Sequence, residues 1–97
     1  MAELVSGPRA LLLNSRDNVA VVIQALKAGE EITVGDHRVT VTADVPFGHK
    51  VAIGEIGSGA AVVKYGEVIG LASAAISPGD HVHVHNVVSA RLPGGGT

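Results

Sequence analysis

Three histidines alternate with two valines near the end of the chain, in the run Asp80-His-Val-His-Val-His-Asn86. In an extended strand, successive side chains point to opposite faces, so the three imidazoles would share one face while the valines anchor the other to a core. Imidazole binds metal ions and exchanges protons near neutral pH. The run therefore predicts a metal-binding or proton-transfer site carried by one strand.

The spacing of a strand limits how many of these rings can act together. A rise of about 3.4 Å per residue separates neighbouring same-face Cα atoms by about 6.8 Å, and the outer pair by about 13.6 Å. Two adjacent imidazoles can lean onto one ion at about 2.0–2.1 Å, whereas all three reach it only if the strand bends sharply. We therefore expect two histidines to converge, with further ligands supplied from elsewhere. The alternative is a solvated polar face on an ordinary edge strand.

A second polar segment is Asp44-Val-Pro-Phe-Gly-His-Lys50, in which Pro46 and Gly48 predict a tight, irregular loop. Such a loop would direct His49 and Lys50 away from the sheet. His49 would then serve as a further ligand or a base, and Lys50 as a point charge for a carboxylate. The alternative is a plain hairpin loop with a solvated Lys-His pair.

Other polar residues favour structural roles when they are taken alone. Lys64 is expected to be solvated, Tyr65 to pack in the core or at its rim, and Asp17-Asn18 to form an Asx-type turn. The sequence contains no phosphate-binding glycine loop, no nucleophile elbow and no helical zinc motif.

Composition indicates one small domain with an aliphatic core. The chain has 97 residues, 46% of them hydrophobic, and its only aromatic residues are Phe47 and Tyr65. The apolar content excludes disorder, and a net charge of −2 gives no case for nucleic acid or an anionic membrane. Cysteine is absent, no apolar run is long enough to span a bilayer, and no signal peptide is evident. We therefore expect a cytoplasmic protein, small enough that a partner would complete its site.

A short turn pattern recurs at residues 26–32, 56–62 and 76–82, where an apolar residue is followed by glycine three positions later and by another apolar residue three positions after that. The pattern predicts a single helical or tight turn whose glycine takes positive φ and leads into a strand. The unequal intervals between the copies indicate a reused local device instead of a solenoid.

The aliphatic and β-branched runs between these turns predict an all-β domain over residues 10–88, with short single-turn helices. Flexible ends are expected at 1–9 and in the Pro/Gly-rich tail 89–97. Residues 19–27 would also suit an amphipathic helix. The expected extended segments are 10–13, 19–23, 32–34, 38–43, 50–53, 61–65 and 68–76.

Several motifs together resemble a known module. They are Asp17-Asn-Val-Ala20, Gly48-His-Lys50, Val63-Lys-Tyr-Gly66, Ile69-Gly70 and the run from Gly79 to Asn86. Over residues 16–88 the chain resembles the small SAF-type domain of altronate and galactarate dehydratases, which is also the small subunit of sulfolactate sulfo-lyase. The resemblance implies a β-clip fold, a compact, bent and mostly antiparallel β structure. It also implies association with a large catalytic subunit, and the chain ends just after the module, as a stand-alone subunit does.

The resemblance further implies a hydro-lyase or related lyase that removes water from a sugar acid, or sulfite from sulfolactate, by β-elimination. A divalent metal such as iron would be shared with the large subunit, and the small subunit would be inactive alone. The alternatives are a non-catalytic carbohydrate- or acid-binding module and a free-standing metal-binding protein. The hydroxy acid, the metal and the oligomeric state, including a homo-oligomer, remain open. The resulting candidate residues are His49, His83 and His85 for catalysis, His81 and His83 for the metal, and Lys50, Lys64 and Asn86 for the substrate.

Overall fold

Short strands separated by tight turns make up the whole of the described chain. The computed structural model describes residues 8–89, and no helix occurs among them. The expected single-turn helices are therefore absent from this part of the chain, whereas the all-β prediction is confirmed. The expected flexible ends lie largely outside the described residues. The strands are β1 (Ala10–Leu11), β2 (Val19–Val22), β3 (Glu31–Val34), β4 (His37–Thr40), β5 (Lys50–Ala52), β6 (Ala61–Lys64), β7 (Glu67–Ala72), β8 (His81–Val82) and β9 (Val87–Val88).

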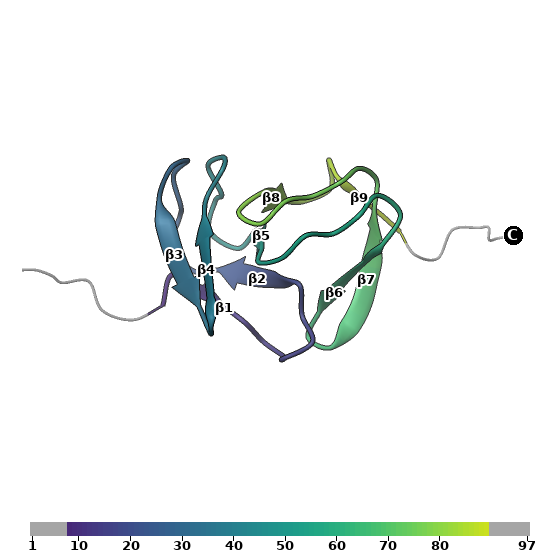
Figure 1. Ribbon diagram of the computed structural model, residues 1–97, viewed down its shortest axis with the longest axis horizontal. Coiled ribbons are helices and arrows are strands. Elements are labelled where there is room, and N and C mark those ends of the chain that lie inside the picture. The colour runs from purple at the N-terminus through teal and green to yellow at the C-terminus, as the bar shows by residue number, and fades with distance from the viewer. Residues whose placement is uncertain (1–7, 90–97) are drawn as a thin grey trace, which may run out of the picture.

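The strands form three antiparallel sheets, with orders β1-β2-β5-β8, β3-β4 and β6-β7-β9. The β3–β4 and β6–β7 hairpins stand at opposite ends of the molecule, and the four-stranded sheet lies between them (Figure 1). Residues 19–27 contain β2 and a bridging turn, so the helical alternative is wrong. The predicted strands at 38–43 and 68–76 are shorter in the structure. They end at Thr40 and Ala72, and the backbone then bends.

One type of turn recurs in both halves of the fold. The apolar-x-x-Gly-x-x-apolar pattern occurs at four places, and the sequence analysis missed the copy at 45–51. The four glycines all have positive φ, as predicted: 93° at Gly29, 87° at Gly48, 84° at Gly59 and 92° at Gly79. Each turn is closed by a hydrogen bond across four residues, such as His49 N to Pro46 O at 3.1 Å. These are β-turns with glycine at the third position, not helical turns.

The four turns pair to make two similar units. Leu26 and Val45 exchange backbone hydrogen bonds in the first unit, and Ile56 and Ile76 do so in the second. In each unit the first turn leads into a hairpin and the second leads into a short strand, β5 or β8. Each unit also has its own aliphatic core cluster. The fold therefore contains two units of similar connectivity, in which the corresponding strands β5 and β8 pair with each other.

The core contains no aromatic side chain, as the composition predicted. Phe47 is 70% exposed and Tyr65 is 71% exposed, so both aromatic rings lie at the surface, and the expectation that Tyr65 packs in the core or at its rim is wrong. Val84 was expected to anchor the histidine strand to a core, but it is 80% exposed. No helix within residues 8–89 has the length and apolar character needed to cross a membrane.

Asp17 and Asn18 form a clamp on the β6–β7 hairpin, so the expected Asx turn at this pair is wrong. The buried Asp17 carboxylate accepts hydrogen bonds from the backbone N–H groups of Tyr65 and Gly66, both at 2.8 Å. The Asn18 amide accepts from Val63 N at 2.8 Å and donates to Ala61 O at 2.9 Å. The clamp therefore fixes the hairpin that carries Lys64.

Replacing Asp17 by alanine should destabilise the domain by about 3 kcal/mol, because hydrogen bonds to a charged acceptor contribute about 1.5–3 kcal/mol each. For a domain of this size we expect the melting temperature to fall by about 10–20 °C, as measured by calorimetry. Asp36→Ala, in the exposed turn between β3 and β4, is the matched control and should change stability by less than about 0.5 kcal/mol. Equal losses in the two variants would contradict the clamp.

Candidate functional site

The pairing of β5 with β8 brings the two polar segments of the sequence together. Lys50 lies opposite Val82 and Val51 opposite His81 in this antiparallel ladder. Continued by one residue, the same register places His49 opposite His83. The two rings stack, with centroids 3.9 Å apart and planes inclined by 12°. A ring from the Gly48 turn therefore joins the ring pair of the histidine run.

The histidine run does not stay extended beyond β8. A turn over residues 83–86 is closed by Asn86 N, which donates to His83 O at 3.1 Å. The Asn86 side chain accepts from His83 N at 3.0 Å and donates to His81 O at 2.9 Å. The turn brings the His85 ring centroid to 5.1 Å from that of His81, far closer than a straight strand would allow. The predicted continuous strand is wrong here, and the sharp bend gathers all three rings.

Three of the rings have the geometry of a metal-binding set. One ring nitrogen from each of His49, His81 and His83 lies within 4.8 Å of the others. His49 Nδ1 and His81 Nε2 are 2.8 Å apart, close to the roughly 3.0–3.4 Å that separates two ligands on an ion at about 2.1 Å. His83 Nδ1 is buried and has no hydrogen-bond partner, a state that a bound ion would relieve. The residues present therefore fit the divalent ion that the resemblance implies.

The electrostatics of the cluster favour neutral imidazoles. Burial lowers the pKa of His81 from its ordinary value near 6.5, and repulsion from the neighbouring His85, His49, His83 and Lys50 lowers it further. Burial, followed by repulsion from His49, Lys50 and His85, also lowers the pKa of His83. Neutral imidazole is the form that binds metal, so both shifts favour binding near neutral pH.

These lowered pKa values also make folding pH-dependent. In the unfolded chain the two histidines take up protons near pH 6.5, while the folded protein still resists protonation. The free energy of unfolding should therefore fall as the pH is lowered from about 7.5 to about 5.5 in urea titrations without metal. The double variant His81→Ala/His83→Ala should flatten this dependence, whereas His37→Ala, on exposed β4, should preserve it. A slope that is the same in all three proteins would contradict the assignment.

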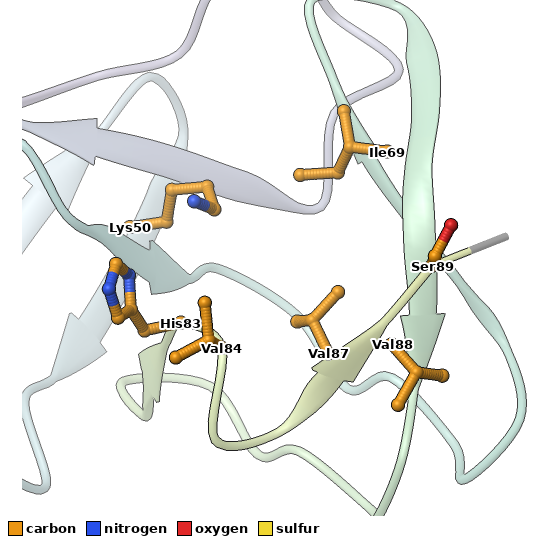
Figure 2. A pocket seen from close by; sticks show the side chains of 7 residues that line it. All are labelled: Lys50, Ile69, His83, Val84, Val87, Val88 and Ser89. Atoms are coloured by element: carbon orange, nitrogen blue, oxygen red, sulfur yellow. The ribbon is translucent and has the colours of Figure 1, made fainter.

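A cavity of about 240 Å³ adjoins the imidazole cluster. Burial lowers the pKa of Lys50, and repulsion from Lys64 adds to the effect. The ion pairs within residues 8–89 are Arg9–Glu30 and Arg38–Glu31, so neither lysine has a carboxylate partner there. Figure 2 shows Lys50, His83 and Val84 on one side of this cavity and the β7–β9 residues on the other. It is lined by Lys50, Ile69, His83, Val84, Val87, Val88 and Ser89.

The structure thus gathers most of the candidate residues at one place. His49, His81, His83 and His85 form one cluster, and Lys50 lies beside it with Lys64 near enough to repel it. Both the oxygen and the nitrogen of the Asn86 amide form hydrogen bonds with the backbone. Asn86 therefore positions the turn. The apolar cavity residues were missed because Ile69, Val87 and Val88 follow the pattern of ordinary strands. The turn pattern at 45–51 is the sequence feature that could have indicated this position for His49, because the turn leads into β5 and β5 pairs with β8.

Comparison with known proteins finds one matching family and several related enzymes. Residues 8–90 match the family described as the altronate/galactarate dehydratase SAF domain. The chain is 47% identical over 74 residues to altronate dehydratase of Escherichia coli, a match covering 76% of this chain and 15% of that enzyme. It is 45% identical over 56 residues to (2R)-sulfolactate sulfo-lyase subunit alpha of Paracoccus pantotrophus, covering 58% of this chain and 84% of that subunit. Galactarate dehydratase (L-threo-forming) of Escherichia coli is 35% identical over 83 residues, covering 84% of this chain and 15% of the enzyme.

Proposed function

Because the chain belongs to the altronate/galactarate dehydratase SAF domain family, we propose that it is the small subunit of a metal-dependent lyase that works with a large catalytic subunit. The chain spans only 15% of the altronate dehydratase, whereas the match covers 84% of a sulfo-lyase subunit alpha, and the name of that relative supports a role within a multi-subunit enzyme. The observation that carries the proposal is the gathering of His49, His81 and His83 beside the Lys50 cavity. Cytoplasmic location and homo-oligomerisation stay predictions.

The proposed reaction is β-elimination from a hydroxy acid. A base takes the proton from the carbon next to the carboxylate, a carbon–carbon double bond forms, and the bond to the leaving hydroxyl or sulfite breaks. The leaving hydroxyl takes a proton from an acid and departs as water. The exposed His85, at the edge of the cluster beside His81, is a candidate proton carrier, and His49 and His83 are further candidates in so far as they do not hold the metal. Lys50 and Lys64 would hold the carboxylate as point charges.

The metal would lie at the centre of the same cluster. His81 and His83, joined by His49, would hold a divalent ion such as iron, and the partner would complete its coordination. When bound, the ion supplies Lewis-acid stabilisation of the negative charge that develops in the reaction. Asn86 would keep His81 and His83 in position through their backbone groups.

Reconstitution tests this proposal directly. A pull-down with the 97-residue chain should capture a large subunit, and the purified complex is then screened against hydroxy acids of different length. We expect the chain alone to be inactive and the complex to turn over at least one acid. Normal assembly without turnover of any hydroxy acid would overturn the proposal.

A second candidate function is a free-standing metal-binding protein, which the three-histidine set on a single chain favours. Calorimetry with zinc or ferrous ion on the isolated chain separates the two functions. Tight binding without a partner supports the second candidate, whereas a lyase subunit that shares its metal needs the complex for full affinity. A non-catalytic acid-binding module would bind the acid without turning it over in any complex.

A further inference from the structure

We infer that the cavity beside Lys50 is a subsite for the acid group and the short carbon chain of a compact hydroxy acid, of about three or four carbon atoms, and that it disfavours a polyhydroxylated six-carbon acid. The inference rests on the proposed function, because it names the substrate class of the same site. Two features of the cavity carry it: its charge and its apolar wall.

The charge at the cavity calls for an anion. Lys50 is half-buried at the start of β5, and Lys64 repels its ammonium group. Neither lysine belongs to an ion pair within residues 8–89. Two like charges without a counter-charge attract a carboxylate or a sulfonate from solution.

The apolar wall of the cavity disfavours the hydroxyl groups of a ligand. Apart from Lys50 and His83 it consists of one serine and four aliphatic side chains, and Figure 2 shows Ile69 and Val87 across the cavity from Lys50. A hydroxyl that leaves water for such a wall loses hydrogen bonds that the wall cannot replace. A polyhydroxylated chain would bury several hydroxyls in this way, whereas a short acid buries few. The aliphatic residues are Ile69, Val84, Val87 and Val88.

Binding of two acids of equal charge tests the subsite on the 97-residue chain. Glycerate, with three carbons, and gluconate, with six, are titrated at constant ionic strength while NMR follows the methyl groups of Ile69, Val84 and Val88. We expect saturable glycerate binding at least about tenfold tighter than gluconate binding, the ratio that one unpaired hydroxyl produces. Equal or tighter gluconate binding, or no saturable glycerate binding, would overturn the inference.

Matched variants assign the binding to this cavity. Lys50→Met should weaken glycerate binding at least about tenfold, whereas Lys27→Met, in the exposed turn before β3, should leave it unchanged. Ile69→Ser supplies a hydroxyl to the wall and should narrow the glycerate-to-gluconate ratio. Ile23→Ser is its control, since Ile23 is 38% exposed, close to the 40% of Ile69, and does not line the cavity. Unchanged affinity in Lys50→Met, with a native NMR spectrum, would contradict the subsite.

The outcome is separable from that of the proposed function. A complex that assembles but eliminates nothing from any hydroxy acid would overturn the lyase proposal and leave the binding ratio intact. An active complex combined with a reversed ratio would overturn the subsite alone.

Discussion

Replacing His81 by alanine is expected to remove the divalent metal from the assembled complex and to lower its turnover by at least about 100-fold, the scale of a lost acid–base or ligand group. His81 Nε2 lies 2.8 Å from His49 Nδ1, and the rings of His83 and His85 flank the same side chain. The domain should remain folded, because His81 is only partly buried and belongs to neither core cluster. Elemental analysis and initial rates measure the two effects.

Two variants control this experiment. His37→Ala removes an exposed imidazole from β4 and should change neither metal content nor rate. His85→Ala should lower the rate while the metal stays bound, because His85 lies outside the three-ring set. Full metal content in the His81→Ala complex would show that this ring is not a ligand.

Replacing Gly79 by alanine is expected to destabilise the domain by more than about 4 kcal/mol, or to prevent folding altogether. A Cβ at this position would overlap the Thr40 carbonyl oxygen, and the φ of 92° is already unfavourable for alanine. The turn cannot retreat easily, because Gly79 O accepts hydrogen bonds from Thr42 N at 3.0 Å and from Thr42 Oγ1 at 3.4 Å. Urea unfolding and the soluble yield measure the loss.

Gly59→Ala is the matched control for this substitution. Gly59 occupies the same position in the same kind of turn, with φ of 84°, but an added Cβ there has no atom within 4 Å. Its cost should be the backbone strain alone, about 1–2 kcal/mol. The difference between the stability losses of the two variants measures the cost of the steric overlap with Thr40 at Gly79. Equal losses would show that the approach is unimportant.

The sequence was sufficient for features that depend on local spacing. The positive φ of Gly29, Gly59 and Gly79 follows from the recurring turn pattern, and the aliphatic core follows from composition. The proximity of His81 and His83 also follows from strand spacing, whereas His49 joins them only through the pairing of β5 with β8. The local predictions succeed because the physical cause lies within a few residues of the chain.

Features that depend on tertiary pairing were not accessible in the same way. The Asp17 carboxylate is occupied by backbone groups of Tyr65 and Gly66, which are 48 and 49 residues away in the chain. The bend that gathers His85 depends on the Asn86 side chain, and no alternation pattern reveals it. The lining role of Ile69 likewise depends on how the β6–β7 hairpin stands against β9.

The two-unit fold has a consequence for how the metal and the protein depend on each other. His49 comes from the first unit, and His81 and His83 come from the second. An ion held by all three would therefore link the two units where β5 pairs with β8. A ligand that binds only the native state adds its binding energy to the energy of folding. Binding of the ion would therefore strengthen the contact between the two units, where Gly79 also lies close to Thr40.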